Sequence, residues 1–244
     1  MNSLIIKEED IETIDEKNFY TLNEDQNAHM NNIVGIKVGK SLKGTILNKG
    51  LCDLVVNTIT PKITCEITAN RPGVESEISL LVGASRPQTM KKVIEHGASL
   101  GITQFHVFKA ELSDKSYLQS KVYEDSEFQK LSELGLSQST CFFKSPKVIV
   151  HKNIHCALSH LANLNISNKL ILSPFAKKGL IKHTSLLPNK PMVLAIGPER
   201  GWTDKELTLL VDNNFSEFSL GPSIMRVEIA LFASLGVINQ YFEK

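Results

Sequence analysis

The chain has 244 residues, of which 27 are Lys or Arg and 26 are Asp or Glu, so its formal net charge is +1 at pH 7. This length predicts one large or two small domains, and no segment is long and apolar enough to cross a membrane. The near-neutral charge favours a neutral, soluble enzyme over a dedicated RNA binder, which often has a pI above ~9. The acidic N-terminus is unlike a signal peptide, and four scattered cysteines without a CxxC pair indicate reduced thiols in a cytoplasmic protein.

Residues 1–72 are expected to form a small β domain. Short β-like runs, such as IVGIKVG at 33–39, alternate with turn residues between about 19 and 68. Strands at such short spacing are typical of a small barrel or sandwich. The sequence NKG at 48–50 predicts a hairpin turn, and NRPG at 70–73 breaks the pattern and indicates a linker.

Residues 73–244 are expected to alternate strands with helices, which predicts βαβ units and a parallel sheet. The expected strands are 78–82, 102–108, 169–172, 191–196 and 215–220, and the expected helices are 89–100, 203–213 and 225–241. Thr203 and Glu206 have the spacing of a capping box at the start of the second of these helices. Small residues in the last helix would allow close packing, either inside the domain or against a second subunit.

Two related motifs in this half indicate a binding site. Residues 194–201 read LAIGPERG and residues 220–228 read LGPSIMRVE, so each apolar run ends in Gly-Pro and is followed by charged residues. Gly allows unusual backbone angles and close approach to a ligand, whereas Pro makes the turn rigid. Open α/β sheets bind ligands at the carboxyl ends of their strands. Two stiff loops that follow strands therefore indicate a binding site. Taken alone, the first motif could equally be a tight strand-to-helix turn with Glu199 exposed.

Together the motifs resemble the C-terminal signature of the SPOUT methyltransferases of the RsmE type. That signature has a strand, IGPEGG, a helix, a second strand, LGP, and then LRxET at the start of a final helix. This chain has IGPERG, LGP and MRVEI in the same order and at similar spacing. The resemblance implies an α/β architecture: a PUA-like, RNA-binding β-barrel over residues 1–72 and a trefoil-knotted SPOUT domain over residues 73–244. His29 and Gly39 in the barrel, and Arg86 near the start of the second domain, extend the resemblance more faintly.

The family methylates N3 of a uridine in small-subunit (16S) ribosomal RNA and takes the methyl group from S-adenosyl-L-methionine, which is bound in the knot. The resemblance therefore implies a cytoplasmic rRNA methyltransferase that acts on the RNA or on the assembled small subunit. It also implies a homodimer that pairs through helices flanking the knot, and it implies neither a metal ion nor a membrane.

The same resemblance assigns the cofactor to three loops that follow strands. The residues implied are Leu172, Ser173, Pro174, Ile196, Gly197, Pro198, Glu199, Arg200, Gly201, Leu220, Gly221, Pro222, Ile224 and Met225.

Arg226 and Glu228 are the catalytic candidates. Uracil N3 carries a proton at neutral pH, and this proton must leave before the nitrogen can attack a methyl group. Arg226 could stabilise negative charge on the uracil oxygens, and Glu228 could orient the base, accept the proton or hold Arg226 in place. The competing interpretation is a surface ion pair of little energetic worth at a helix N-terminus, where an acidic residue compensates the helix dipole.

Several positions differ from the family pattern. Arg200 replaces a glycine, Val227 and Ile229 replace two threonines, and Gly35 stands where the barrel has an arginine. The arginine usual near the N-terminus is absent from residues 1–6, and residues 137–139 echo an EQxxR segment without its arginine. Because most of the missing residues are basic, two alternatives stay open. One is a non-catalytic RNA-binding or ribosome-assembly protein that retains the knotted fold, and the other is a methyltransferase with a different RNA target.

Two further clusters are interpreted as structural. His151, His155 and His160 with Cys156 have spacings seen in metal sites, but HExxH, a paired cysteine motif and a nearby acidic partner are all missing, so surface or capping histidines are expected. The aromatic pair at 142–143 could stack on bases, but core packing is the favoured interpretation.

Overall fold

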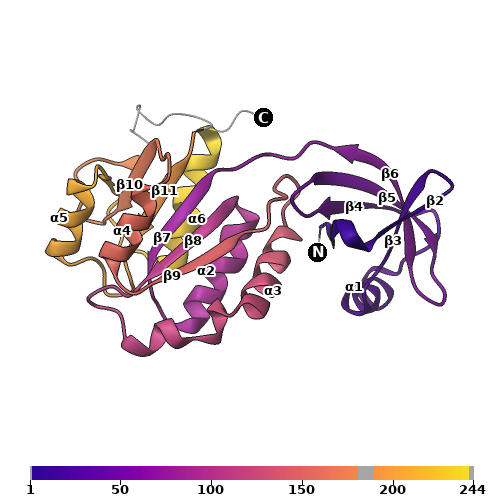
Figure 1. Cartoon of the computed structure of the whole chain (residues 1–244), viewed down its shortest axis with the longest axis horizontal. Coiled ribbons are helices and arrows are strands. Elements are labelled where there is room, and N and C mark those ends of the chain that lie inside the picture. Colours follow the sequence, from indigo (N-terminus) through magenta and orange to yellow (C-terminus); the bar gives the residue numbers. More distant parts are fainter. Residues whose placement is uncertain (1, 181–189, 242–244) are drawn as a thin grey trace. The chain divides into compact units, whose positions relative to one another are not determined.

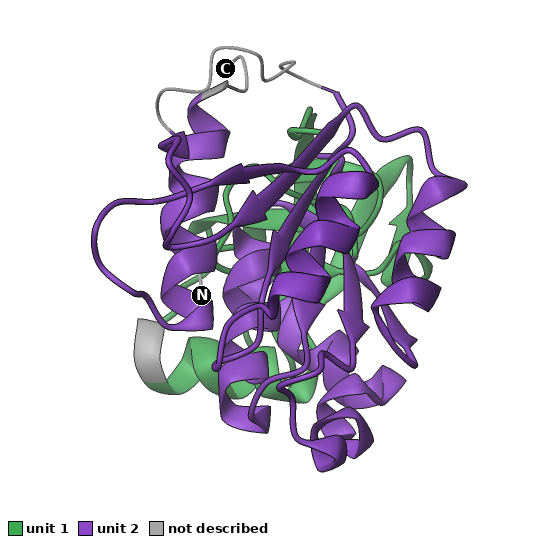
Figure 2. Cartoon of the chain, turned by 90° about the vertical axis from the view of Figure 1, so that its left-hand side faces the viewer, with its two compact units in different colours: residues 1–75, 136–145 green, residues 76–135, 146–244 purple. Residues whose placement is uncertain are grey.

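The computed structural model describes residues 2–180 and 190–241 (Figure 1). It divides into two compact units, shown in separate colours in Figure 2: unit 1 is Met1–Glu75 with Leu136–Ser145, and unit 2 is Ser76–Gly135 with Pro146–Lys244. Nothing in the sequence pattern predicts that Leu136–Ser145 belongs with unit 1. The assignment of residues 1–72 to a PUA-like domain and of 73–244 to a SPOUT domain stays a prediction.

Unit 1 is built on a six-stranded sheet in the order β1-β4-β5-β6-β3-β2, in which only the β1–β4 pair is parallel. Its elements are β1 Leu4–Ile6, β2 Ile11–Ile14, β3 Lys17–Thr21, α1 Glu24–His29, β4 Ser41–Ile46, β5 Gly50–Thr58 and β6 Thr64–Arg71, with a 3-10 turn at Glu8–Asp10 and a π-helical turn at Met30–Val34. The expected hairpin turn joins β4 to β5, and Asn48 adopts a φ of 63° there. Buried side chains such as Leu4, Leu54 and Ile63 form the core of this unit.

The prediction of a strand-like run at residues 33–39 is wrong. The chain there leaves the π-helical turn Met30–Val34, and Gly35 then adopts the left-handed conformation with a φ of 59°. The preceding helix α1 begins with a capping box in which the Asn23 side chain accepts a hydrogen bond from the Gln26 backbone N–H at 2.9 Å. This start signal was overlooked because the apolar run that follows it dominates the pattern.

Unit 2 contains a six-stranded sheet in the order β12-β10-β11-β7-β8-β9, and all its paired strands are parallel. Its strands are β7 Ile78–Gly83, β8 Ile102–Phe108, β9 Lys147–His151, β10 Asn168–Leu172, β11 Met192–Ile196 and β12 Ser216–Phe218. Its helices are α2 Pro87–Ser99, α3 Asp125–Leu136, α4 Ile154–Ala162, α5 Asp204–Asp212 and α6 Val227–Ile238, with 3-10 turns at Lys115–Gln119, Lys121–Tyr123 and Asn239–Tyr241. The predicted parallel α/β architecture is confirmed.

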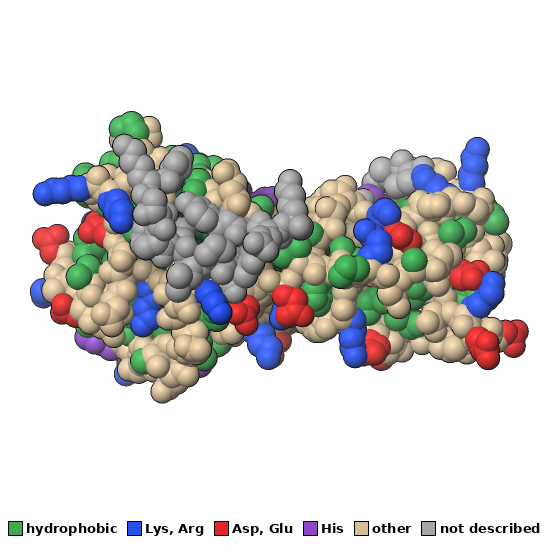
Figure 3. All heavy atoms as spheres, turned by 90° about the horizontal axis from the view of Figure 1, so that it is seen from above, with side chains coloured by type: hydrophobic (Ala, Val, Ile, Leu, Met, Phe, Trp, Pro, Cys, Tyr) green, Lys and Arg blue, Asp and Glu red, His purple; other side chains and the backbone are tan. Residues whose placement is uncertain are grey.

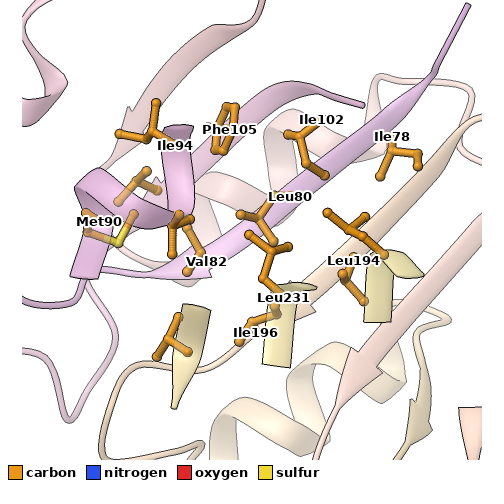
Figure 4. Close-up of a cluster of buried hydrophobic side chains, with 14 of the residues drawn as sticks. Ile78, Leu80, Val82, Met90, Ile94, Ile102, Phe105, Leu194, Ile196 and Leu231 are labelled. Carbon is orange, nitrogen blue, oxygen red and sulfur yellow. The ribbon is translucent and has the colours of Figure 1, made fainter. Parts of the chain in front are cut away.

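Helices cover both faces of this sheet (Figure 1). On one face, Leu80 and Leu194 of neighbouring strands pack with Leu231 of α6 in a cluster that also includes α2 and α3 (Figure 4). On the other face, Leu81 packs with Leu158 of α4 in a cluster that also includes α5. Successive residues of a strand point to opposite faces, so a strand covered on both faces is apolar throughout. The loops at the strand ends are therefore the parts of the sheet left to form a site.

The capping box predicted for α5 is confirmed. The Thr203 hydroxyl accepts a hydrogen bond from the Glu206 backbone N–H at 3.3 Å, and the Glu206 carboxylate accepts one from the Thr203 N–H at 3.0 Å. The same carboxylate accepts a hydrogen bond from the Glu111 N–H at 3.0 Å, so it also ties α5 to the loop after β8. Within the described part of the chain, no helix has the length and apolarity needed to span a bilayer. The knot stays a prediction.

Candidate functional site

Three loops surround a cavity of about 110 Å³ in unit 2. They follow β10, β11 and β12, which are neighbours in the sheet and run parallel. The carboxyl ends of these strands therefore meet at one edge, which is where open α/β sheets bind ligands. The cavity lies between the two Gly-Pro motifs, as the sequence interpretation requires.

Most of the predicted cofactor-binding residues line this cavity. The lining residues that were predicted are Leu172, Ser173, Pro174, Ile196, Gly197, Pro198, Glu199, Gly201, Leu220, Gly221, Ile224 and Met225. Arg200 and Pro222 were predicted but do not line it, whereas Ser223, Val227 and Ala230 line it and were not predicted. Val227 and Ala230 are three positions apart at the start of α6, so they share one face of the helix, and this spacing is the signal that could have linked the two residues to each other. Their binding roles stay predictions.

Trp202 fixes the loop of the first motif. Its indole Nε1 donates a hydrogen bond to the Leu172 carbonyl oxygen at 3.0 Å, and its ring stacks on Phe108 with 6.1 Å between the ring centroids. A Cβ atom added at Gly197 would lie 3.1 Å from the Trp202 ring and 3.2 Å from the Gly201 carbonyl carbon. Gly201 adopts a φ of 79°, which favours glycine. The loop therefore needs both glycines, and the tryptophan ties it to the end of β10.

Gly83 brings the end of β7 against the same loop. A Cβ atom added there would lie 2.7 Å from both the backbone nitrogen and Cδ of Pro198. Pro198 is rigid and its backbone cannot move aside easily. A glycine at the end of β7 is therefore required for the observed position of the loop.

Glu199 links the loop to the start of α2. Its carboxylate lies 3.3 Å from Nε of Arg86 and accepts a hydrogen bond from the Thr89 hydroxyl at 3.2 Å. A hydrogen bond with Tyr117 and the negative charge of Glu199 raise the pKa of Arg86 above its usual value, so this guanidinium stays charged. The interpretation of Glu199 as merely exposed does not hold, because the structure gives its carboxylate two partners.

The two predicted catalytic residues have different surroundings. Arg226 is exposed at the N-cap of α6 and forms no ion pair with any described residue, although its neighbours Met225 and Val227 both line the cavity. Glu228 is 6% exposed, and its Oε1 lies 3.8 Å from Nζ of Lys92 on α2. Neither side chain lines the cavity itself. If they act on a substrate, they must therefore contact it at the rim of the cavity, where α6 begins.

Three histidines gather elsewhere in unit 2. His151 and His160 lie beside His106 of β8, with ring centroids 5.2 to 5.5 Å apart, and Nδ1 of His106 lies 3.1 Å from Nε2 of His151. Burial first, and then the neighbouring histidines, lower the pKa of His106 to about 4, and burial and His160 lower that of His151. The expectation of a surface or capping role is wrong for His151, which is 7% exposed. Over the described ranges, no group of three His, Cys, Asp or Glu residues could hold a metal ion.

The aromatic pair at 142–143 is structural, as expected. Phe142 is 8% exposed and Phe143 is 5% exposed. Both belong to unit 1, and a Cβ atom on Gly73 of the same unit would collide with the Phe143 ring. Stacking of these rings on RNA bases is therefore excluded in this conformation.

Comparison with known proteins finds RNA methyltransferases by family model and by sequence. A family model described as an RNA methyltransferase domain matches residues 73–239. The chain is 32% identical over 158 residues to ribosomal RNA small subunit methyltransferase E 1 of Borreliella burgdorferi, an alignment that covers 65% of each protein and so spans slightly less than two thirds of that relative. It is 26% identical over 223 residues to ribosomal RNA small subunit methyltransferase E of Treponema pallidum, which covers 86% of this chain and 81% of the relative.

Two solved structures share the fold over nearly the whole chain. Ribosomal RNA small subunit methyltransferase E of Neisseria gonorrhoeae, solved with S-adenosylmethionine, superposes with a TM-score of 0.73 at 18% identity, covering 99% of this chain and 98% of that one. A methyltransferase of Legionella pneumophila, solved with the same cofactor, gives a TM-score of 0.72 at 19% identity, covering 99% of both chains.

The chain thus shares its fold with these two solved structures. The chain belongs to the RNA methyltransferase domain family, and its predicted resemblance to the RsmE type is confirmed.

Proposed function

We propose that the chain transfers a methyl group from S-adenosyl-L-methionine to N3 of a uridine in small-subunit (16S) ribosomal RNA. The observation that carries this proposal is the cavity between the two Gly-Pro loops, in a chain whose motifs follow the RsmE order. The names of its relatives support a small-subunit RNA substrate. Such a substrate is consistent with the predicted location in the cytoplasm.

The residues around the cavity suit this cofactor. Ile196, Leu220 and Ile224 give apolar walls for an adenine ring, and Ser173 and Ser223 offer hydroxyl groups for its polar parts. The volume of about 110 Å³ is small, because ligand sites usually measure ~300–1,000 Å³. We therefore expect the loops to separate on binding, or part of the ligand to lie outside the enclosed space. When bound, S-adenosylmethionine supplies a methyl group made electrophilic by its sulfonium sulfur.

Arg226 and Glu228 receive distinct proposed roles. Arg226 is an exposed cation at the rim that forms no ion pair within the described part of the chain, so it can donate hydrogen bonds to a uracil oxygen as N3 loses its proton. Glu228 is buried beside Lys92, and we propose that it positions Arg226 by fixing the start of α6 against α2. The acceptor of the N3 proton is then Glu228 through water, or bulk solvent.

The close approach of Gly83 to Pro198 gives a test of the cofactor site. Gly83→Ala is expected to weaken binding of S-adenosylmethionine at least about tenfold, because the new methyl group displaces the loop and overpacking costs ~1–3 kcal/mol. Calorimetric titration measures this affinity. Gly236→Ala is the matched control, since a Cβ atom there meets nothing within 4 Å. Equal affinities for the two folded variants would remove the Gly-Pro loop from the cofactor site.

We further propose a homodimer that pairs through α6. Ile229 on this helix is 47% exposed and Ile224, in the loop just before it, is 77% exposed, so two large apolar side chains are available for a contact there. A specific interface should bury at least ~1,000 Å² in total. Light scattering at micromolar concentration is expected to give twice the monomer mass for the wild type and the monomer mass for Ile229→Glu. Val211→Glu, which changes an exposed apolar residue of α5, is the control and should stay dimeric.

A methylation assay tests the proposed activity directly. Purified protein is incubated with small-subunit particles and methyl-labelled S-adenosylmethionine, and the RNA is digested and its nucleosides are identified by mass spectrometry. Label in N3-methyluridine supports the proposal. Label in another nucleoside would favour a different RNA target, and RNA binding without any label would favour the non-catalytic assembly protein.

A further inference from the structure

A second hollow lies along the same edge of the parallel sheet. Its volume is about 490 Å³, and its lining comes from the chain after β7, the chain after β8 and the loop after β11. These three strands are neighbours in the sheet, and all end at this edge. Pro198 and Glu199 line both this hollow and the cofactor cavity. One loop thus separates two adjoining spaces, and the second has a volume typical of a ligand site.

Arg200 belongs to this second hollow. The sequence pattern assigned it to the cofactor, but its side chain lines the second hollow and not the first. It is exposed and forms no ion pair with any described residue. It is also the residue that replaces a glycine of the family pattern. This chain therefore has a cation beside the proposed cofactor loop, at a position where the family pattern has glycine.

Arg86 gives the same hollow a second guanidinium group. Unlike Arg200, it is held by Glu199 at 3.3 Å and by a hydrogen bond with Tyr117. Arginine pairs bind phosphate oxygens with good geometry. On the face shown in Figure 3, basic and acidic side chains are interspersed, in keeping with a net charge of +1. On that face, an RNA would therefore meet individual cations rather than a broad basic patch.

The carboxylates of the hollow narrow the class of ligand. Glu111 and Asp114 line it together with the two arginines, and so does Glu199, whose carboxylate is paired with Arg86. Asp114 accepts hydrogen bonds from the Ser116 N–H at 2.8 Å and hydroxyl at 2.7 Å, and these lower its pKa, so it is ionised at neutral pH. The three carboxylates, which outnumber the two arginines, oppose binding of a free inorganic anion. A nucleotide, however, has phosphate oxygens for the arginines and also hydroxyl and N–H donors that need such acceptors.

We propose that this hollow holds a nucleotide of the RNA substrate, with its phosphate on Arg200 and Arg86 and its ribose or base donors toward Glu111 and Asp114. This inference rests on the proposed function as an RNA methyltransferase. It makes Arg200 a residue that determines how RNA is bound, and it places that RNA next to the cofactor because the two spaces share a loop.

The test replaces Arg200 by the glycine of the family pattern. Arg200→Gly is expected to raise the KM for small-subunit RNA about tenfold, the effect of losing one charge-assisted hydrogen bond, without changing the affinity for S-adenosylmethionine. The plot of log affinity for the RNA against log salt concentration should become shallower by ~0.7, the value for one phosphate contact on a single strand. Arg200→Lys keeps the charge and should keep the wild-type salt slope.

Lys205→Ala is the control, because it removes one exposed cation from the same unit at the start of α5, outside this hollow. It should leave both the KM and the salt slope unchanged. If Arg200→Gly behaves like this control, or weakens cofactor binding instead of RNA binding, the inference is overturned. The salt slope is measured by RNA binding alone. If the wild type binds RNA but never methylates it, the proposed activity is contradicted. The salt slopes of the variants still show whether the hollow binds the RNA.

Discussion

Replacement of Arg226 by Ala is expected to lower the rate of methyl transfer by ~10²–10³-fold, the usual effect of removing one preorganised group that stabilises charge in the transition state. The reaction needs such a group because the uracil oxygens gain negative charge as N3 loses its proton. Arg226 is exposed beside residues that line the cavity proposed for the cofactor, and it forms no ion pair with any described residue, so we expect its guanidinium to be able to contact the base. The affinity for S-adenosylmethionine should change little.

Single-turnover methylation of small-subunit particles, together with cofactor titration, measures both effects. Arg226→Lys keeps the charge but loses the planar fork of donors, so it should recover only part of the rate. If Arg226 is only a surface residue at a helix end, its removal costs at most about 1 kcal/mol of stability and leaves the rate intact. Equal rates for the wild type and Arg226→Ala would therefore remove this residue from the mechanism.

Acidification from pH 7 to pH 5 is expected to lower the free energy of unfolding by about 2 kcal/mol through His106. Burial and two neighbouring histidines hold the pKa of His106 at about 4 in the folded protein, against ~6.5 in the unfolded chain. The unfolded state therefore takes up the proton first as the pH falls. The stabilisation is complete above pH 6.5 and is lost progressively toward pH 4, and the whole loss is about 3 kcal/mol.

The groups that face one another here are His106 on β8, His151 on β9 and His160 on α4. Urea unfolding at several pH values measures the dependence. His106→Leu should leave only the smaller pH dependence that His151 contributes between pH 7 and pH 5, whereas His155→Gln, a change at an exposed histidine outside the cluster, should leave the wild-type slope. A slope in His106→Leu equal to that of the wild type would contradict the assignment.

The two Gly-Pro loops around the cavity could be predicted because their signals are local. A Gly-Pro pair after an apolar run predicts a rigid turn at a strand end, and the Thr203 to Glu206 spacing predicts the helix that follows the first of them. A parallel sheet then puts all such turns at one edge. These rules need only short stretches of sequence, which is why the residues on both sides of the cavity were found.

The contacts that hold these loops in place could not be predicted, because they depend on the order of strands in the sheet. Gly83 meets Pro198 since β7 lies beside β11, and Arg86 meets Glu199 for the same reason. The hydrogen bond from Trp202 to Leu172 joins neighbouring strands in the same way. Local periodicity does not specify strand order. Contacts between residues more than a hundred positions apart, such as Gly83 with Pro198 and Arg86 with Glu199, therefore cannot be predicted from it.

Other features were overlooked because a stronger pattern covered them. His106 lies inside the apolar run of β8, which predicts a strand but says nothing of histidine neighbours on β9 and α4. Leu136–Ser145 returns to unit 1 without a change in composition that would mark a boundary. Both features are set by tertiary packing, which a single sequence does not specify.

The nucleosides of small-subunit ribosomal RNA from a strain that lacks this gene provide the most direct measurement of the central claim. Mass spectrometry is expected to show that N3-methyluridine is absent from this RNA, restored by the wild-type gene and not restored by a gene that encodes Arg226→Ala. An unchanged amount of N3-methyluridine in the strain without the gene would contradict the proposed function.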